Sequence, residues 1–261
     1  LEQRVYINGF PKAGTHLVEQ MVRQIAAPIT DRPWLGSFAR NSWSTEMAHI
    51  DRALSVIGQF PAGGYLKGHM GWHPDISEAF RNAGVAMIFI HRDLRDVAVS
   101  TTYHILNDEV DENGNDKLVH PGKEAFRALG GFHDILKGVI VGIPGYPGVV
   151  ERWQHYKPWL YEKWVLSLSF SEIVNNPQMS ASLMLRYVAG VSARLVGCEM
   201  ILDKRDHDYI VATMIEAMKR PTTTKRRGVP GGFRDVWNME IEEVYVSTLH
   251  GAKTLRPVYA G

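Results

Sequence analysis

Cysteine is nearly absent from this chain of 261 residues, which contains only Cys198. A single cysteine cannot form an intramolecular disulfide or supply a cysteine-rich zinc site. Long apolar segments are missing too, since no run approaches the roughly 20 residues that a helix needs to cross a bilayer. The chain also has no Asn-x-Ser/Thr acceptor for glycosylation. We therefore expect a cytoplasmic protein without a membrane segment.

A strong net charge is absent as well. The formal net charge is +1 at pH 7, which argues against a general nucleic-acid binder. Any functional positive charge must then be local. The hydrophobic content of 45% is normal for a globular core, and the length suits one large domain or two small ones. The sequence has no internal repeat and no low-complexity tract.

Short apolar stretches alternate with helical patterns along the chain. Strands are predicted at residues 5–7, 65–68, 85–90 and 164–170. Helices are predicted at residues 17–27, 46–59, 74–82, from Asp93 or Asp96 to about 106, and at 123–141, 148–163, 178–190, 205–219 and 238–250. Loops are predicted at residues 28–45, 107–122 and 220–237. This alternation predicts an α/β fold with a parallel sheet, covered on both faces, whose ligands bind at the carboxyl ends of the strands.

A glycine-containing loop joins the first predicted strand to the first predicted helix. Its sequence is Gly9-Phe10-Pro11-Lys12-Ala13-Gly14-Thr15-His16. Such a loop lets backbone N–H groups converge on an anion, and Lys12 adds a full charge. The glycines have the spacing of the nucleotide P-loop G-x-x-x-x-G-K-[ST], but Thr15 and His16 stand where its Lys and Ser/Thr belong. The segment is either a phosphate loop of another kind or an ordinary turn with a surface lysine.

Three further groups of residues carry candidate chemistry. Arg92 ends the most apolar strand, and Ser100 follows about two helical turns later, so the two can hold a phosphate; alternatively, Arg92 and Arg95 pair with Asp93 and Asp96 on an exposed helix. His69 follows a strand end and can act as a general base, or with His73 as half of a metal pair. Gly71 and Pro74 disfavour the helix that such a metal pair requires. Residues 225–232 form a basic, glycine-rich segment, which by itself reads as a solvated loop.

These motifs together resemble those of the sulfotransferases that use 3′-phosphoadenosine 5′-phosphosulfate (PAPS). The resemblance rests on four short motifs: Pro-Lys-Ala-Gly-Thr at 11–15, Lys-x-His at 67–69, Arg-x-x-x-Asp-x-x-x-Ser at 92–100, and Arg-Arg-Gly-x-x-Gly at 226–231. It extends from Tyr6 to about Asn238 and implies a single domain spanning residues 1–261 with a P-loop-like nucleotide-binding fold. It also implies PAPS as co-substrate and its desulfonated form, PAP, as product.

The resemblance further implies a role for each matching residue. His69 is the general base, Lys12 stabilises the oxygen that bridges sulfur to the 5′-phosphate, and Lys67 assists the sulfonate oxygens. The 5′-phosphate is held by backbone N–H groups of the loop, at Ala13, Gly14, Thr15 and His16. The 3′-phosphate is held by Arg92, Ser100, Arg226, Arg227 and Gly228. The rest of the nucleotide is enclosed by Leu17, Phe170 and Thr213.

The sequence departs from the family pattern at positions that concern the adenine. Leu17 stands where the family commonly has a tryptophan that stacks on the base, and Phe170 replaces a tyrosine. No metal is expected, because fixed lysines can neutralise a sulfonate, which carries less charge than a terminal phosphate. The rival interpretations are a small-molecule kinase with an unusual phosphate loop and a non-catalytic nucleotide-binding protein.

The acceptor is left open by the sequence. Small aromatic alcohols, sugars, peptides and lipids all remain candidates, and monomer and homodimer both remain open. An apolar acceptor pocket can be lined by the aromatic residues Trp34, Phe38, Trp43, Trp72 and Tyr103, which can equally fill the edges of the core. The polar stretch 107–122 is either a lid or a surface loop.

Overall fold

The computed structural model describes residues 3–28, 47–107, 122–196, 203–220 and 229–254. The chain divides into two compact units, each made of two stretches. The first unit comprises Leu1–Arg92 and His155–Val229, and the second comprises Asp93–Gln154 and Pro230–Gly261. Each unit has its own buried apolar side chains. The single domain expected over residues 1–261 is not tested by this division and stays a prediction.

A parallel sheet forms the centre of the first unit. Its five strands run in the order β2-β3-β1-β4-β7, and all neighbouring pairs are parallel. Their bounds are β1 Arg4–Gly9, β2 Ala27–Pro28, β3 Gly64–Gly68, β4 Ala86–His91 and β7 Leu166–Ser169. β1 lies in the middle, with Ile7 opposite both Lys67 and Ile88. The carboxyl ends of β3, β1 and β4 therefore lie next to one another at one edge.

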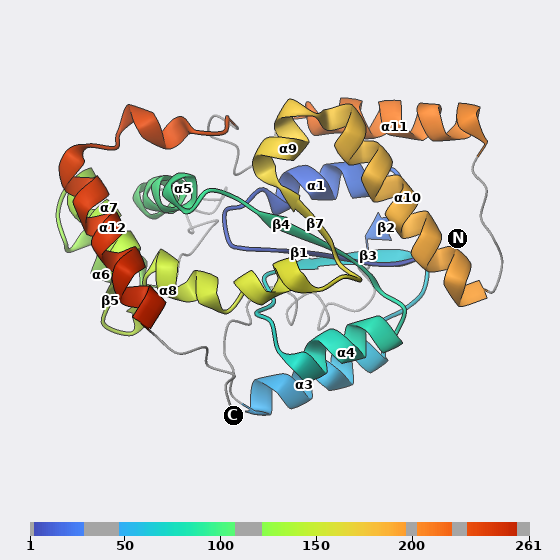
Figure 1. The fold of residues 1–261 in the computed structure, drawn as a ribbon, viewed down its shortest axis with the longest axis horizontal. Coiled ribbons are helices and arrows are strands. Elements are labelled where there is room, and N and C mark those ends of the chain that lie inside the picture. The colour runs from blue at the N-terminus through green and yellow to red at the C-terminus, as the bar shows by residue number, and fades with distance from the viewer. Residues whose placement is uncertain (1–2, 29–46, 108–121, 197–202, 221–228, 255–261) are drawn as a thin grey trace, which may run out of the picture. The chain divides into compact units, whose positions relative to one another are not determined.

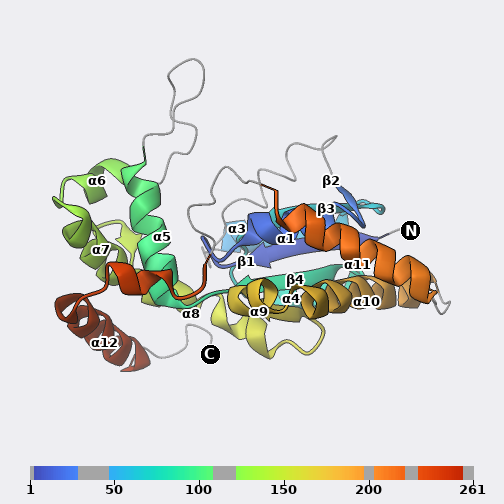
Figure 2. The same cartoon turned by 90° about the horizontal axis from the view of Figure 1, so that it is seen from above.

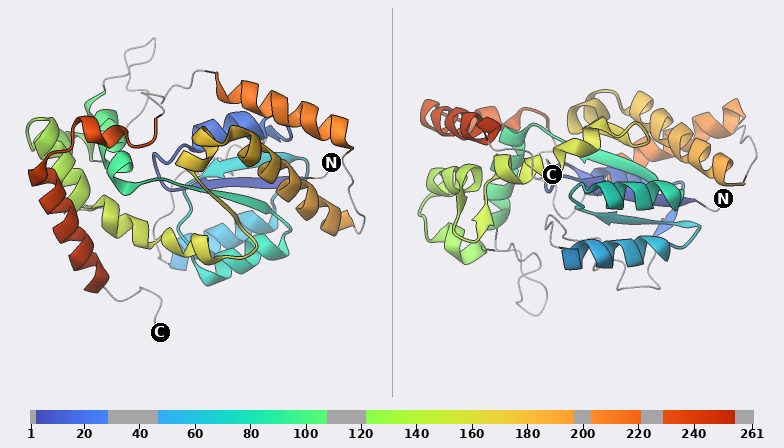
Figure 3. Two further views of the ribbon diagram at one scale, coloured as in Figure 1. Left: turned by 45° about the horizontal axis from the view of Figure 1, so that its top comes forward. Right: turned by 60° about the horizontal axis from the view of Figure 1, so that its bottom comes forward.

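Helices cover both faces of this sheet. Their bounds are α1 Thr15–Val22, α3 Met47–Gly58, α4 Pro74–Asn82, α9 Phe170–Asn175, α10 Pro177–Val196 and α11 Lys204–Met218, with a 3-10 helix, η1, at Lys157–Tyr161. α3 and α4 pack together on one face, and α1 and α10 cover the other (Figure 1). α11 runs beside α1 and α10 (Figures 2 and 3). This arrangement buries the central strands on both faces, which explains why β4 is continuously apolar.

The second unit is mainly helical in its described part. Its elements are α5 Leu94–Leu106, α6 Lys123–Arg127, α7 Phe132–Val141, β5 Gly142–Ile143, β6 Tyr146–Pro147, α8 Val149–Gln154, η2 Gly232–Asp235 and α12 Met239–Thr254. α7 packs against α5, α8 and α12, and β5 and β6 form a short antiparallel hairpin. The core includes Ile135, Val139 and Ile241, whose side chains are almost fully buried.

The α/β fold with a central parallel sheet flanked by helices is confirmed. The four predicted strands appear, and Asp93 caps α5 by accepting a hydrogen bond from the Arg95 N–H. Two predicted helices are wrong as continuous elements. The segment 123–141 breaks between α6 and α7, where Gly130 has a φ of 126°. The segment 148–163 breaks between α8 and η1, because Pro158 has no N–H with which to continue the hydrogen bonding of α8 and instead lies in the first turn of η1.

Two smaller corrections concern the ends of elements. α1 ends at Val22, earlier than the predicted Ala27, because Ala27 and Pro28 pair with β3 as the edge strand β2. The hairpin of β5 and β6 was not predicted, since each of its strands has only two residues. The loops predicted at 28–45 and 107–122 lie almost wholly outside the described residues.

Candidate functional site

The loop between β1 and α1 has an unusual backbone. Lys12 has a φ of 68°, and it is the one non-glycine residue with a positive φ in the described part of the chain. Gly14 follows with a φ of 111° and forms the N-cap of α1. The loop is closed by a hydrogen bond from the Ala13 N–H to the Phe10 carbonyl, at 3.0 Å. A left-handed lysine is costly in free energy and is typical of functional loops.

The first turn of α1 suits an anion. Gly14 has no side chain that could cap the helix, and this turn contains no acidic residue. The N–H groups at a helix N-terminus carry partial positive charge and accept an anion readily. Ala13 and Thr15 are buried, so they can reach a ligand mainly through their backbone, whereas Lys12 and His16 are partly exposed. The loop therefore places Lys12 beside a helix N-terminus, and its role as an anion site stays a prediction.

An aromatic ring connects this loop to the end of β4. Phe170 is 5% exposed, and a Cβ placed on Gly14 would lie 2.7 Å from its Cδ2. The guanidinium carbon of Arg92 lies 4.2 Å from the centre of the same ring. Arg92 also donates a hydrogen bond to the Val229 carbonyl, at 3.1 Å. Gly14, Phe170 and Arg92, all predicted site residues, therefore form one contiguous group.

His69 is fixed at the carboxyl end of β3. Its Nδ1 lies 2.7 Å from the carbonyl oxygen of Gly9, the last residue of β1. Because a carbonyl can only accept, Nδ1 carries the hydrogen and Nε2 keeps a lone pair. The hydroxyl of Tyr156 donates to the His69 carbonyl at 3.0 Å, which holds the backbone as well. The ring is thus set in the tautomer that a general base requires.

The surroundings of His69 keep its ring neutral. Burial is the main cause that lowers the pKa of His69 to about 4, and nearby positive charge on His16, Lys67 and Lys12 lowers it further. The Gly9 carbonyl acts in the opposite direction. Lys12 and His16 follow the end of β1 and Lys67 lies near the end of its neighbour β3, so all three stand at the same edge of the sheet as His69. Both lysines and the histidine of the predicted catalytic group therefore meet at the ends of β1 and β3.

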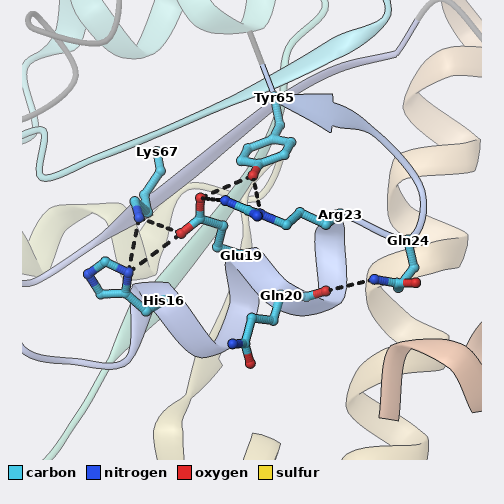
Figure 4. Close-up of polar contacts among 7 residues, drawn as sticks. All are labelled: His16, Glu19, Gln20, Arg23, Gln24, Tyr65 and Lys67. Carbon is cyan, nitrogen blue, oxygen red and sulfur yellow. Dashed lines mark hydrogen bonds and ion pairs between the residues drawn. The ribbon is translucent and has the colours of Figure 1, made fainter. Parts of the chain in front are cut away.

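Lys67 has a carboxylate partner that the sequence motifs did not indicate. Its Nζ donates to Oε2 of Glu19, on α1, and lies 3.1 Å from Nδ1 of His16 (Figure 4). Arg23 and Tyr65 donate to the other oxygen of Glu19, at 3.1 and 3.0 Å. A glutamate one turn into an amphipathic helix belongs to no recognisable motif. Its contact with Lys67 forms only when β3 pairs with β1, beside α1.

The remaining predicted site residues have mixed outcomes. Leu17 on α1 and Thr213 on α11 are both half-buried on helices that pack together, and the Thr213 hydroxyl donates to the Ile210 carbonyl at 2.7 Å. Ser100 is half-buried on α5 in the second unit, so its pairing with Arg92 stays a prediction. Arg226, Arg227 and Gly228 lie outside the described residues.

The aspartate of the motif Arg-x-x-x-Asp-x-x-x-Ser, Asp96, has a structural role. This buried carboxylate accepts hydrogen bonds from the backbone N–H groups of Gly231 and Phe233, at 2.8 and 2.9 Å. The alternative that the arginines pair with the neighbouring aspartates is seen for Arg95, which forms an ion pair with Asp93 at 2.7 Å. Asp96 instead fixes the backbone that follows the basic segment 225–228.

The segment after β3 is held by residues that sequence reasoning missed. Asn8 on β1 accepts from the Met70 N–H and donates to the Met70 carbonyl, at 2.8 and 3.0 Å. The indole N–H of Trp159 donates to the same carbonyl at 2.9 Å. An asparagine inside an otherwise apolar buried strand was the one signal available, because a buried amide must find partners. Trp159 offered no signal of this kind.

Two of the aromatic residues proposed to line an acceptor pocket lie in the described part of the chain, and their role in such a pocket stays a prediction. Trp72 donates its indole N–H to Glu162 at 2.7 Å, and Ser77 donates to the same carboxylate oxygen at 2.6 Å. Tyr103 lies in the second unit and packs on Phe132, with ring centres 4.8 Å apart. Trp34, Phe38 and Trp43 are outside the described residues.

The described residues contain neither a cluster of metal ligands nor a helix that could span a membrane. Within the described residues, no group of three or more His, Cys, Asp or Glu side chains is placed to hold a metal ion. His73, the proposed partner of His69 in a metal pair, instead caps α4 by accepting from the Asp75 N–H at 3.3 Å. No helix in the described ranges combines the length and apolar composition needed to span a bilayer.

Solved structures share the fold of this chain. Mouse sulfotransferase SULT7A1 in complex with PAP is 12% identical, with a TM-score of 0.58 over 99% of this chain and 87% of the mouse chain. Retinol dehydratase with androsterone and the inactive cofactor PAP is 13% identical, with a TM-score of 0.55 over 97% and 82%. Retinol dehydratase with retinol and PAP is 12% identical, with a TM-score of 0.56 over 98% and 83%.

Sequence comparisons add nothing to this likeness. No protein-family model matches the chain, and no curated protein sequence matches it. At 12 to 13% identity, the structural likeness establishes a sulfotransferase fold.

Proposed function

We propose that this chain is a sulfotransferase that moves the sulfuryl group of PAPS to a hydroxyl group of a small acceptor. The observation that carries the proposal is the meeting of Lys12, Lys67 and His69 at the ends of β1 and β3. These are the positions at which an open parallel sheet binds its ligands. The fold is that of proteins solved with PAP, which supports PAPS as the co-substrate.

The described residues fit such a nucleotide. The N-terminus of α1, whose first turn contains no acidic residue, together with Lys12, suits the 5′-phosphate. Arg92, held against Phe170, suits the 3′-phosphate, because a guanidinium forms a planar, two-pronged contact with phosphate oxygens. We assign the further contacts of this phosphate to Ser100, Arg226, Arg227 and Gly228, and those of the adenosine to Leu17, Phe170 and Thr213. When bound, PAPS supplies an activated sulfonate with a good leaving group.

Three residues of the chain carry out the proton transfer and the charge stabilisation. His69 accepts the proton of the acceptor hydroxyl at Nε2, since Nδ1 is occupied by the Gly9 carbonyl. Lys12 stabilises the charge that develops on the oxygen between sulfur and the 5′-phosphate, and Lys67 stabilises the sulfonate oxygens. Two fixed cations can provide the charge neutralisation that magnesium provides in a kinase, so we propose that the reaction needs no metal.

The acceptor is proposed by chemical class. Androsterone and retinol, which are named in the two retinol dehydratase complexes, are largely hydrocarbon molecules with a hydroxyl group. We therefore favour a small apolar alcohol over a carbohydrate or a peptide. The single cysteine of the chain fits a reducing compartment, and we place the protein in the cytoplasm. Monomer and homodimer are both consistent with the proposal.

One experiment tests the reaction directly. The purified protein is incubated with PAPS carrying labelled sulfur and with panels of apolar alcohols, carbohydrates and peptides. We expect labelled product and PAP to form with an alcohol, equally well in the presence of a metal chelator. A protein that ignores PAPS but consumes ATP with magnesium would instead be a kinase. One that binds PAP without turning over any acceptor would be a nucleotide-binding protein.

A second experiment tests how the nucleotide is recognised. Arg92→Ala should weaken the binding of PAP far more than the binding of adenosine 5′-monophosphate, which lacks the 3′-phosphate. The two affinities are compared by titration calorimetry in the native protein and in the variant. Equal losses for both nucleotides would remove Arg92 from the 3′-phosphate site.

A further inference from the structure

Glu19 lies among the cations of the proposed nucleotide site. It is on α1, one turn after the loop that contains Lys12, and its carboxylate contacts Lys67, Arg23 and Tyr65 (Figure 4). Oε2 of Glu19 also lies 3.5 Å from Nδ1 of His16. A negative charge in this position is unexpected, because the proposed ligand is itself an anion with charge at both ends.

The two oxygens of Glu19 have different roles. Oε1 accepts from Arg23 and from the Tyr65 hydroxyl, and these two groups are joined by a hydrogen bond of 2.8 Å from Arg23 Nε to the same hydroxyl. Oε2 faces the other way, toward Lys67 and His16. Arg23 and Tyr65 thus hold the carboxylate through Oε1, and its other oxygen, Oε2, contacts Lys67.

The carboxylate is ionised in this setting. Burial raises the pKa of Glu19, but hydrogen bonds from His16, Lys67 and Arg23 outweigh that effect and hold the pKa well below its usual range. The side chain of Glu19 is only 13% exposed, whereas that of Lys67 is 27% exposed. A charge pair that is partly shielded from water is screened less than a surface pair, so removing one member has a measurable effect on the other.

Lys67 is shared between Glu19 and any ligand that reaches the end of β3. An ammonium group has three N–H donors; in this structure one goes to Oε2 of Glu19, and Nδ1 of His16 lies 3.1 Å from the same ammonium nitrogen. His69 follows Lys67 by two residues, just past the end of β3, and the positive charge of Lys67 helps to lower the pKa of His69, so the ammonium group acts on the imidazole. A sulfonate placed beside His69 would therefore compete with Glu19 for this ammonium group.

We infer that Glu19 is an internal counter-anion for Lys67, with which the sulfonate of the ligand must compete, and that Glu19 thereby limits the affinity of the site. This inference rests on the proposed function, because it takes PAPS as the ligand. Glu19 is a positioning residue, since it acts on the ligand through Lys67. It keeps a cationic site from holding PAPS too tightly before the sulfuryl group is transferred.

The test compares Glu19→Gln with the native protein. Gln has the same shape but no charge, so Lys67 loses its competing anion. PAPS is titrated calorimetrically in the absence of acceptor, and we expect it to bind roughly tenfold more tightly to the variant, the effect of one unit charge about 10 Å away at an effective dielectric constant near 20. The same variant should melt at a lower temperature, because Arg23, Tyr65 and Lys67 lose a charged acceptor.

These two changes in opposite directions distinguish the inference from a purely structural role. A Glu19 that only braces α1 would, when replaced, lower the melting temperature and leave PAPS affinity unchanged or weaker, and that result would overturn the inference. Glu19→Asp is the fallback if the Gln variant does not fold. It withdraws the carboxylate from Lys67 while keeping its charge, and should tighten PAPS binding by a smaller factor.

Two further variants serve as controls. Asp208→Asn makes the same change of charge at a carboxylate that is 58% exposed near the start of α11, and PAPS affinity should stay within about twofold of native because an exposed charge is screened. In a Lys67→Met background, Glu19→Gln should lose most of its gain, since the two residues are then uncoupled. A full gain in that background would mean that Glu19 acts without Lys67.

The outcome also separates this inference from the proposed function. If the native protein does not bind PAPS or PAP at all, the proposed function fails, and the inference fails with it. If the native protein binds PAPS and turns it over, but Glu19→Gln shows no gain in affinity, the inference alone is wrong.

Discussion

The two segments that carry the candidate catalytic residues are built in different ways. The loop at residues 10–14 is defined by its own backbone, with left-handed conformations at Lys12 and Gly14 and a hydrogen bond between Ala13 and Phe10. The segment at residues 69–72 has no such feature. It is held from outside, by Asn8 on β1 and by Tyr156 and Trp159, which are 87 and 89 residues away from their partners.

This difference explains which part of the site a short motif can reveal. A loop that is determined by local backbone conformation needs particular residues in a fixed order, so it appears in the sequence as a motif. For a segment that is held by distant side chains, the sequence indicates only the candidate catalytic residue and not the residues that hold it. Variants in the two segments should therefore fail differently, and the predictions below test this from the largest effect to the smallest.

The largest effect is expected from His69→Asn. The Asn side chain can still donate to the Gly9 carbonyl in place of Nδ1, but it has no counterpart of the basic Nε2. Turnover should fall by at least about 100-fold, the usual contribution of a positioned base, while PAP binding stays close to native. Steady-state kinetics and calorimetry measure the two quantities. Full activity in this variant would remove His69 from the mechanism.

The next effect is expected from Gly14→Ala, in the other segment. The left-handed backbone costs an alanine about 1–2 kcal/mol, and its Cβ would also lie 2.7 Å from Phe170. Both stability and PAP affinity should fall together, in contrast to His69→Asn. Gly190→Ala in α10 is the matched control, because its Cβ meets nothing within 4 Å and should stabilise the helix. Native PAP affinity in Gly14→Ala would contradict the role of this loop.

The pH dependence of stability comes third. The unfolded chain takes up a proton at His69 near the ordinary pKa of 6.5, but the folded protein does so only near 4. The free energy of unfolding should therefore fall as the pH is lowered from about 6.5 to about 4, by up to about 1.4 kcal/mol per pH unit from this group. Denaturant titrations compare the native protein with His69→Asn, which lacks this titration. Parallel curves for the two proteins would mean that the folded and unfolded pKa values do not differ.

The smallest effect is expected from Tyr156→Phe, which removes the hydroxyl that supports the His69 carbonyl. Stability should fall by about 0.5–1.5 kcal/mol, and kcat/KM should fall by a factor of a few. Tyr187→Phe is the control, because its hydroxyl donates to the Trp164 carbonyl at 2.7 Å, elsewhere in the first unit. Because this hydroxyl also accepts from the Met87 N–H at 3.0 Å, the variant should lose at least as much stability, but without loss of kcat/KM. Equal kinetics in both variants would separate Tyr156 from the function of His69.

Much of the fold could be predicted because its determinants are local. The apolar run of β4 and the helical spacing of α3 and α11 identify these elements, and Pro74 and Asp93 mark helix starts. The failures occur where a single residue interrupts a periodic pattern. Gly130 divides one predicted helix and Pro158 divides another, although the apolar spacing continues across both.

The candidate site was predictable only in part, for a physical reason. Lys12, Lys67 and His69 belong to short motifs next to strand ends, so the sequence indicates them. Glu19 and Lys67 are 48 residues apart, and their contact depends on the pairing of β3 with β1. No local pattern encodes such a register. The carboxylate that pairs with Lys67 therefore appears only in the folded protein.

The central position of β1 has a consequence for how the protein loses its site on heating. β1 is paired along its length on both sides, so its amide hydrogens should exchange with solvent only through global unfolding. The Gly9 carbonyl, which orients the imidazole, is the last of this slowest-exchanging strand. Thermal inactivation and cooperative unfolding of the first unit should accordingly have the same midpoint temperature. No local unfolding step should release the His69 imidazole at a lower temperature.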